Sequence, residues 1–209
     1  MAIPSPVYIY RIVHRDNLQI IINERKLLSP SRATNPNYIP IGETDLIAQR
    51  GTKSITLDPF GEMRDYISFY FGTRSPMLYC IHHGYDVKQR PQNEIVYLVS
   101  SIETLENHGC RYVFTDGHSF AAISQFFNNK QDLRQVDWNA VRLKRWNNTE
   151  DDPDRKRRKE AECLVYQEVP FSAIIGIGVY NQEAFNYITN VLSANNISVP
   201  VRIKPDWYY

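Results

Sequence analysis

The feature that most constrains the fold of this chain is a series of short apolar runs that are rich in β-branched and aromatic residues. Such runs predict strands, which we place at 7–13, 65–71, 94–100, 111–115, 162–169 and 173–180, with an edge strand in the terminal VRIKPDWYY. Helical signals predict helices at 16–26, 118–128 and 182–194. Because strands outnumber helices and several follow one another directly, we predict an α+β fold rather than a doubly wound sheet.

Length, charge and cysteine content restrict the class of protein. A chain of 209 residues with 43% hydrophobic residues suits one domain with a substantial core, so we predict a single domain over 1–209. With a net charge of +1, a polyanion would have to meet a local basic patch. Cys80, Cys110 and Cys163 lack metal-ligand spacing, so we expect free thiols and no metal. The chain shows no signal peptide and no run of about 18 apolar residues, so we expect a cytoplasmic protein without membrane contact.

Two long polar connections interrupt the predicted elements. Residues 29–53 are rich in proline and asparagine, and residues 129–161 contain Trp138, Trp146 and the basic run RKRRK at 155–159. Connections of this length in a compact domain are usually functional or mobile.

The basic run leads directly into a predicted strand through Glu160 and Glu162, in the sequence RKRRKEAECLVY. Alternation along 162–168 puts Glu162, Leu164, Tyr166 and Glu168 on one face, and Cys163 and Val165 on the other. A carboxylate at the entrance of a strand is held by the backbone, which suits catalysis. A salt bridge between Glu162 and one of the cations explains the pattern equally well.

Single residues elsewhere are weaker candidates. Arg11 in the first strand is either an edge-strand side chain that reaches water or an anchor for a phosphate or ribose. Tyr70 lies on a strand face with Tyr66 and Ser68 that could stack an aromatic ligand. Arg50 is a lone loop arginine, which is solvated far more often than it is functional, and His118 at the end of a strand is close to neutral evidence. Glycine-rich phosphate loops and the HExxH and GxSxG motifs are missing, so kinases, Rossmann dehydrogenases, zincins and α/β-hydrolases have no support.

Seven segments carry a resemblance to a known family. They are VYIYRIVHRDNLQIII, RKLLSP, DYISFYFGTRSPMLYCI, IVYLVSS, RYVFTDGH, AECLV and IKPDWYY. Together and in this order they resemble the DarT family, the DNA ADP-ribosyltransferase toxins of bacterial toxin–antitoxin systems. The resemblance spans nearly the whole chain and implies an ADP-ribosyltransferase fold, a split mixed sheet with flanking helices that binds NAD.

The resemblance also assigns roles to residues. It makes Glu162 and Arg50 catalytic, and it implies that 29–53 covers bound NAD and that 118–161 recognises the substrate. The cofactor contacts that it implies fall on Arg11, Ile12, Val13, Ile20, Leu28, Arg50 and Tyr70. The substrate contacts are expected at His118, Arg155, Lys156 and Arg157. One departure is Arg11, because the family usually has histidine at this position.

The implied activity is the transfer of ADP-ribose from NAD to a thymine or guanine of single-stranded DNA. Glu162 would stabilise the oxocarbenium-like transition state through the ribose 2′-hydroxyl, and the base must be unpaired to be reached. Cations 155–159 with Trp138 or Trp146 would hold phosphates and stack bases. A macrodomain-type antitoxin is the implied partner. The alternatives are transfer to RNA or protein, and a nucleic-acid-binding domain without catalysis.

Overall fold

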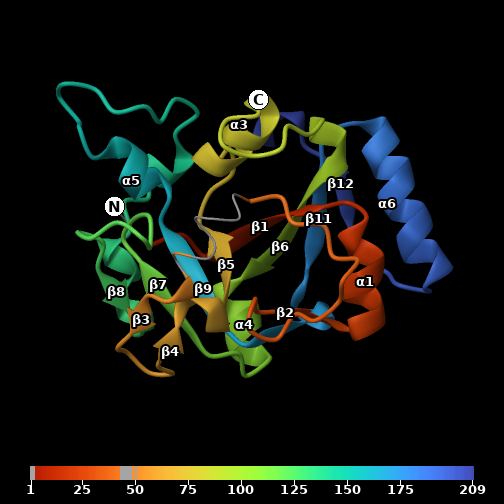
Figure 1. Cartoon of the computed structure of the whole chain (residues 1–209), viewed down its shortest axis with the longest axis horizontal. Coiled ribbons are helices and arrows are strands. Elements are labelled where there is room, and N and C mark those ends of the chain that lie inside the picture. The colour runs from red at the N-terminus through yellow and green to blue at the C-terminus, as the bar shows by residue number, and fades with distance from the viewer. Residues whose placement is uncertain (1–2, 43–48, 50) are drawn as a thin grey trace.

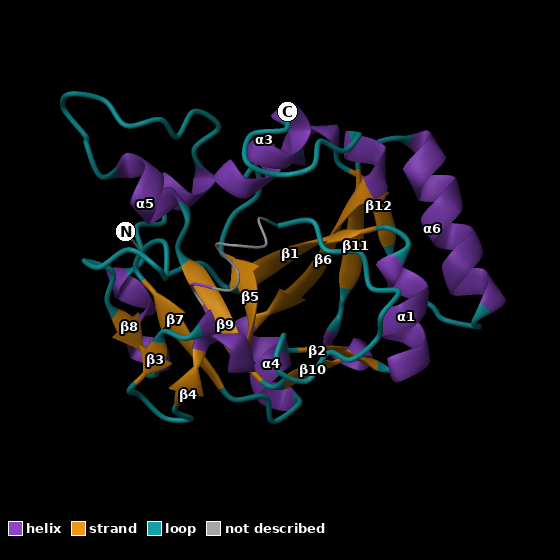
Figure 2. Cartoon of the chain, viewed as in Figure 1, coloured by secondary structure: helices purple, strands orange, loops and turns teal. Residues whose placement is uncertain are grey.

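An eight-stranded mixed sheet forms the centre of the computed structural model, which describes residues 3–42, 49 and 51–209 (Figures 1 and 2). The strand order is β12-β11-β6-β1-β5-β9-β7-β8, and among the described strands only β11 and β12 pair in parallel. The strands are β1 Tyr8–His14, β5 Tyr66–Tyr70, β6 Ile95–Ser101, β7 Tyr112–Thr115, β8 Phe126–Phe127, β9 Glu162–Tyr166, β11 Gly176–Val179 and β12 Val201–Ile203. Two small sheets pair β2 (Lys26–Leu28) with β10 (Glu168–Pro170), and β3 (Ser54–Ile55) with β4 (Gly61–Glu62).

Helices cover the sheet on different sides. They are α1 Asn17–Glu24, α3 Pro76–His83, α4 Ile102–Asn107, α5 Arg155–Lys159 and α6 Gln182–Ala194. Figure 2 shows α1 and α6 together at one end of the molecule, where Leu18 and Ile188 join the largest apolar cluster. Helix α3 packs Leu78 and Ile81 into a second cluster with Tyr97 of β6. In the part of the chain that the structure describes, no helix is long and apolar enough to span a bilayer.

The sheet is split between β1 and β5. β1 faces β6 over its whole length, from Tyr8 to His14, and β5 faces β9 over its five residues. Between the described residues of β1 and β5, Tyr10 and Tyr70 are the one facing pair. The molecule therefore consists of two half-sheets that meet at this pair of tyrosines, and the predicted split mixed sheet is confirmed.

The strands predicted at 7–13, 65–71, 94–100, 111–115 and 173–180 are confirmed, with ends that move by up to three residues. The helix predicted at 182–194 is confirmed as α6, whose N-terminus is capped by the Asn181 side chain accepting from Ala184 N at 3.0 Å. The predicted helix at 16–26 is shorter, and the Asp16 side chain makes no capping hydrogen bond. The terminal edge strand is confirmed at Val201–Ile203.

The prediction of a helix at 118–128 is wrong. This segment consists of turns that lead into β8, which pairs antiparallel with β7. Asp116 closes the turn, because its Oδ1 accepts from the backbone N–H of Gln125 at 2.8 Å. This hydrogen bond between residues nine positions apart therefore stabilises a turn in place of the helix that the spacing of Ile123 and its neighbours predicts.

The single strand predicted at 162–169 is two strands. Gln167 has a φ of 60°, a left-handed conformation that breaks an extended chain. Beyond it, Glu168 faces Leu28 in the small sheet of β10 and β2, so Glu168 does not share the face of Glu162. The alternation within Glu162–Tyr166 is confirmed, with Cys163 and Val165 in the largest apolar cluster and Leu164 in a different one.

Candidate active site

Glu162 is the first residue of β9, and its side chain is completely buried. Its Oε1 accepts two hydrogen bonds from Ser119, one from the hydroxyl at 2.9 Å and one from the backbone N–H at 3.2 Å. Two donors on one oxygen fix the orientation of the carboxylate. The structure thereby separates Glu162 from Glu160, which lies two residues earlier at the C-terminal end of α5.

The segment TDGHS at 115–119 shapes the surroundings of this carboxylate. Thr115 Oγ1 accepts the Glu162 N–H at 3.2 Å and donates to Gly117 O at 2.6 Å. The two hydrogen bonds of Thr115 lie where β7 ends beside the start of β9, and Ser119 follows within the same turn. The strand pair β7–β9 therefore brings a serine to the buried carboxylate and a threonine to the backbone N–H of Glu162.

Lys53 connects the two predicted functional loops at this point. Its Nζ donates to the carbonyl oxygen of Ser119 at 2.6 Å. The ammonium also lies 5.1 Å from the ring centroid of Phe126 in β8. Residues 29–53 and 118–161 are consequently in contact beside Glu162. Sequence analysis missed Ser119 and Lys53, which have no motif of their own.

Tyr70 and Tyr10 continue the row of side chains that begins with Glu162. Tyr70 faces Glu162 in β9 and Tyr10 in β1, and facing residues point to the same side of a sheet. The Tyr70 side chain is 7% exposed, and its hydroxyl lies 3.5 Å from Met77 Sδ of α3. The catalytic candidate thus lies one strand away from the joint between the two half-sheets.

Arg11 lies beside the split rather than at the edge of the sheet. β1 is an internal strand, so the edge-strand interpretation of Arg11 is wrong. Arg11 Nη1 donates to the carbonyl oxygen of Ser68 in β5 at 2.9 Å, while its Nε is buried and has no hydrogen-bond partner among the described residues. The guanidinium therefore supplies a contact between two strands whose backbones do not pair there, and it retains a polar atom that a ligand could satisfy.

The other predicted cofactor positions lie on three elements. Ile12 and Val13 are buried in β1, on opposite faces of the strand, since they belong to different apolar clusters. Ile20 on α1 and Leu28 in β2 are half-buried. Arg50 lies outside the residues that the structure describes.

Most of the basic run is paired with acidic side chains. Arg157 holds Asp154 through Nε and Nη2 at 2.7 Å each, and its Nη1 lies 3.1 Å from Asp116. Arg155 pairs with Asp152 at 3.1 Å, and Arg158 pairs with Asp137, Asp152 and Asp154. These side-chain pairs stabilise the path of 118–161.

Lys159 is buried among backbone oxygens. It is 2% exposed, and its Nζ donates to Thr73 O and Val141 O at 2.7 Å each. Burial lowers the pKa of Lys159 to about 8, and the nearby charge of Arg74 acts in the same direction. Lys159 thereby ties the turn after β5 to the short helix Ala140–Arg142 of the 118–161 segment.

Other cations of the 118–161 segment are exposed. Lys156 is exposed and lies 5.8 Å from the ring centroid of Trp146. Arg142, Lys144 and Arg145 are also exposed or nearly so, and none of them forms an ion pair with a residue that the structure describes. Positive charge available to a polyanion is therefore concentrated in VRLKRW at 141–146.

Trp138 and Trp146, one of which was expected to stack a base, are both buried, and Trp138 belongs to the core. It is 3% exposed, its indole N–H donates to Leu133 O, and its ring packs edge-on against Phe71. Trp146 is 7% exposed and donates to the hydroxyl of Tyr209 at 2.6 Å. Both tryptophans anchor the 118–161 segment to the rest of the domain.

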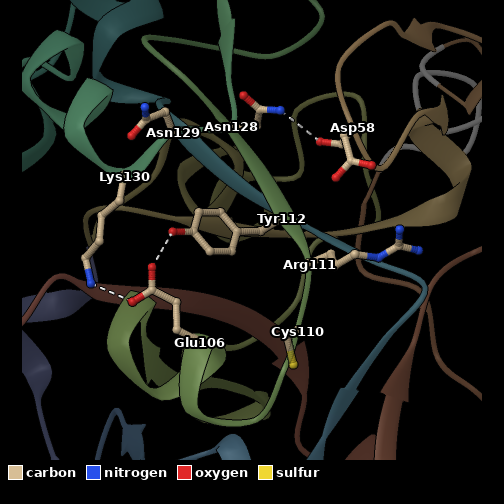
Figure 3. A pocket seen from close by; sticks show the side chains of 8 residues that line it. All are labelled: Asp58, Glu106, Cys110, Arg111, Tyr112, Asn128, Asn129 and Lys130. Carbon is tan, nitrogen blue, oxygen red and sulfur yellow. Dashed lines mark hydrogen bonds and ion pairs between the residues drawn. The ribbon is translucent and has the colours of Figure 1, made fainter.

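A hollow of about 470 Å³ is lined by the eight residues that Figure 3 labels, among them Tyr112, which faces Val165 rather than Glu162 in β9. Its polar groups satisfy one another. Glu106 accepts from Tyr112 at 3.0 Å and from Lys130 at 2.6 Å, and Asn128 donates to the backbone of Asp58 at 3.3 Å. This hollow therefore belongs to the packing of β7 and β8 rather than to the site.

The comparisons with known proteins agree with this arrangement. A family model described as "ssDNA thymidine ADP-ribosyltransferase, DarT" matches residues 10–209. A DNA ADP-ribosyl transferase of Escherichia coli O127:H6 is 33% identical over 99% of this chain and 95% of its own length. The structure of Thermus sp. 2.9 DarT in complex with ADP-ribosylated ssDNA superposes with a TM-score of 0.94 at 34% identity, covering 100% of this chain and 99% of that chain.

A second structure of the same relative contains the nucleotide. Thermus sp. 2.9 DarT in complex with NAD+ superposes with a TM-score of 0.89 at 33% identity, covering 100% of both chains. The resemblance inferred from seven sequence segments is thus confirmed by sequence and by fold. The chain belongs to the DarT family of NAD-dependent DNA ADP-ribosyltransferases.

Proposed function

We propose that the protein transfers ADP-ribose from NAD to a thymine base of single-stranded DNA. The observation that carries this proposal is the buried carboxylate of Glu162, held by two donors of Ser119 in a chain of the DarT family. Thymine is preferred to guanine because the matching family is described as acting on thymidine. NAD is the donor substrate, and nicotinamide is the leaving group.

In the proposed reaction the bond between nicotinamide and ribose breaks first, and nicotinamide keeps the electron pair. A ring nitrogen of the base then attacks the ribose carbon and gives up its proton. Glu162 hydrogen-bonds the ribose 2′-hydroxyl more strongly as positive charge builds on the sugar, which lowers the barrier. Glu162 also accepts the proton from the attacking base.

Arg50 polarises the base or holds an NAD phosphate in this proposal. A guanidinium stays protonated up to a pH of about 12, so it does not serve as a general base. Arg11, Ile12, Val13, Ile20, Leu28 and Tyr70 contribute the NAD contacts. The buried, unpaired Nε of Arg11 supports its share of this role, because a bound ligand would satisfy it.

Residues 29–53 cover NAD, and residues 118–161 recognise the DNA. The hydrogen bond between Lys53 and Ser119 supports the idea that the two segments act together. His118 and Lys156 contact DNA directly, together with the exposed cations of VRLKRW at 141–146. Arg155 and Arg157 contribute by shaping the loop, since acidic neighbours engage both of them. The target base is flipped out or single-stranded.

The biological role proposed for this activity is that of a toxin restrained by a macrodomain-type antitoxin. One structural neighbour, Thermosipho africanus DarTG in complex with ADP-ribose, has this fold at a TM-score of 0.75 and 20% identity. Both substrates, NAD and DNA, are found in the bacterial cytoplasm, which is the proposed location.

The test is mass spectrometry of short single-stranded oligonucleotides after incubation with NAD. We expect a gain of one ADP-ribose on thymine-containing oligonucleotides and none on oligonucleotides without thymine. Glu162→Gln should lower the transfer rate by about 10²-fold or more. Glu160→Gln, two residues away at the end of α5, is the matched control and should retain the wild-type rate.

The outcomes distinguish the alternatives. An adduct on guanine would make guanine the modified base in place of thymine. An adduct on RNA or protein alone would mean that the substrate is not DNA. If the wild type consumes no NAD with any acceptor, the proposed function is wrong, and a nucleic-acid-binding domain without catalysis is the remaining interpretation.

A further inference from the structure

A groove of about 290 Å³ lies on the sheet between β1 and β12, and the function proposed above does not use it. Its floor is β11, where Gly176 and Gly178 alternate with buried Ile177. Two glycines on one face of a strand leave the sheet backbone without side chains. Trp207 occupies part of this space, since a Cβ on Gly178 would lie only 2.4 Å from its ring.

The groove lies in the same cross-strand row as Glu162. Gly176 faces Val99, Val99 faces Tyr10, Tyr10 faces Tyr70, and Tyr70 faces Glu162. Residues that face each other in this way point to one side of the sheet. Four strand spacings of about 4.8 Å separate the two ends of the row by roughly 19 Å. The groove is therefore an extension of the catalytic side of the molecule.

The walls of the groove are aromatic and partly exposed. Tyr8 is 44% exposed, and Tyr10 packs edge-on against Trp207 with ring centroids 5.2 Å apart. An exposed tyrosine beside a glycine floor offers one ring face to a flat ligand. Stacking on such side chains is how proteins bind single-stranded nucleic acids without depending on sequence.

The charged residues around the groove are cationic. Arg202 and Lys204, which lie on the same side of the chain at β12, are the charged residues among its lining. Neither forms an ion pair with a residue that the structure describes. The nearest acidic residue in sequence, Asp206, is exposed and does not line the groove.

Tyr10 in the wall of the groove responds to charge from the 118–161 segment. Burial raises the pKa of Tyr10, as does Tyr8, whereas the positive charge of Arg142 opposes this rise. The two cations at the β12 end of the groove, Arg202 and Lys204, complement the phosphates of a strand that extends along the row from Glu162.

We infer that this groove binds nucleotides of single-stranded DNA that flank the modified base, with a base stacked on Tyr8 and phosphates contacted by Arg202 and Lys204. The inference rests on the proposed function and adds a second contact region for the same substrate. It predicts that the enzyme prefers oligonucleotides that extend from the target base far enough to reach β12.

The first test uses the wild-type protein alone. Oligonucleotides with one thymidine are extended by deoxyadenosines on the 5′ side or on the 3′ side, and the KM for each is measured at saturating NAD. We expect KM to fall with length on one side and then to level off once the groove is filled. A KM that does not change with length on either side would overturn the inference while leaving the proposed function intact.

The second test uses the exposed Tyr8 and Arg202 and the half-buried Lys204, all of which lie outside the apolar clusters. Tyr8→Ala should raise the KM of the long oligonucleotide about tenfold. Lys204→Gln and Arg202→Gln should each reduce the slope of log KM against log salt by about 0.7. None of the three should change the KM of the shortest oligonucleotide or of NAD.

Lys26→Gln is the matched control for Lys204→Gln, because Lys26 lies in β2 beside the largest apolar cluster, away from the groove. Groove variants that behave like Lys26→Gln with every oligonucleotide would contradict the inference. Failure of the wild type to modify any oligonucleotide would instead overturn the proposed function and the inference together. Unchanged DNA kinetics with lost binding of a protein antitoxin would reassign the groove to that partner.

Discussion

At the scale of single residues, the site depends on how Glu162 is held. Alternation along the strand and the family resemblance together selected Glu162, since Glu160 belongs with the charge run whereas Glu162 enters the strand. Ser119 escaped prediction because its contact with Glu162 joins residues 43 positions apart. A serine in a polar turn has many possible partners, and only the pairing of β7 with β9 selects this one.

The hydroxyl of Ser119 is expected to orient the Glu162 carboxylate for catalysis. Ser119→Ala removes the donor at 2.9 Å and leaves the backbone donor at 3.2 Å. We expect kcat for ADP-ribosyl transfer to fall about 10²-fold, at the lower end of the roughly 10²- to 10³-fold cost of losing one positioned donor at an active site, because the backbone donor remains. The KM for NAD should change much less.

Ser100→Ala provides the comparison for this variant. The Ser100 hydroxyl is also buried and donates to Ala173 O at 2.7 Å, far along the sheet from Glu162. Both variants should lose similar stability in thermal unfolding, but only Ser119→Ala should lose kcat. Equal activity of the two variants would show that Ser119 does not position the carboxylate.

Lys159 gives stability a defined dependence on pH. Its pKa is about 8 in the folded protein and about 10.5 as the ordinary value of an unfolded chain. Between these pH values the unfolded chain binds more protons, so the free energy of unfolding rises with pH. The neutral amine still has two N–H groups for Thr73 O and Val141 O.

Chemical denaturation of the wild type and of Lys159→Met at pH 7 to 10.5 measures this contribution. Loss of the two hydrogen bonds changes the free energy of unfolding of the variant by an amount that does not depend on pH. The free energy of unfolding of the wild type should rise relative to that of the variant by about 2–3 kcal/mol from pH 8 to 10.5, because each pKa unit corresponds to about 1.36 kcal/mol. Two parallel curves would mean that Lys159 keeps its ordinary pKa when folded.

At the scale of elements, sequence patterns located most strands but not the ends and partners of polar segments. The strand that begins at Glu162 ends at Tyr166, because the next residue, Gln167, has a positive φ that no apolar pattern indicates. The helix predicted at 118–128 is replaced by a hairpin turn because Asp116 bonds to Gln125. In both cases a local backbone conformation or a cross-strand contact overrides the periodicity.

In the basic segment, likewise, the density of cations in the sequence does not show which side chains form ion pairs in the folded chain. The run at 155–159 has the highest density of cations, yet its arginines pair with Asp116, Asp137, Asp152 and Asp154. Those aspartates are dispersed along the sequence and gather only in the folded chain. Lys144 and Arg145, in a less charged stretch, retain exposed side chains.

These two groups of cations should respond differently to neutralisation. Arg157→Gln breaks the bidentate contact with Asp154 and the contact with Asp116, so it should lower the free energy of unfolding by about 1–3 kcal/mol. Lys144→Gln with Arg145→Gln should leave stability within about 0.5 kcal/mol of the wild type. The double variant should instead raise the KM for DNA and reduce its salt dependence.

Thermal unfolding and oligonucleotide kinetics at several salt concentrations separate the two effects. An Arg157→Gln variant with unchanged stability and a reduced salt slope would place Arg157 on DNA rather than within the loop. A stability loss in the Lys144 and Arg145 double variant would assign these residues a structural role that the described contacts do not show.

At the scale of the whole molecule, the strand order could be anticipated only through the family resemblance. Apolar runs predict that strands exist, but they do not show that the first strand lies in the middle of the sheet. That placement corrected the interpretation of Arg11, which is an internal residue beside the split. The contact between Lys53 and Ser119, which are 66 positions apart, likewise follows from the assembled fold.

The assembled fold predicts where NAD binding should slow hydrogen exchange. A ligand that binds only the folded state stabilises it, by about 2.7 kcal/mol at a concentration of 100 Kd. If 29–53 covers NAD and Lys53 transmits the closure to Ser119, backbone amides in 29–42, 51–53 and 118–125 should gain protection. Helix α6, on the outside of the far half-sheet, should show no gain beyond the global stabilisation.

The decisive comparison is Lys53→Gln, which removes the ammonium that donates to Ser119 O while leaving Glu162 and its two donors in place. In this variant NAD should still protect 29–42, because those contacts do not pass through Lys53, but protection of 118–125 should be lost. Protection of both segments in the variant would show that NAD reaches each loop independently. Protection of α6 alone would place NAD away from the split and contradict the proposed roles of both loops.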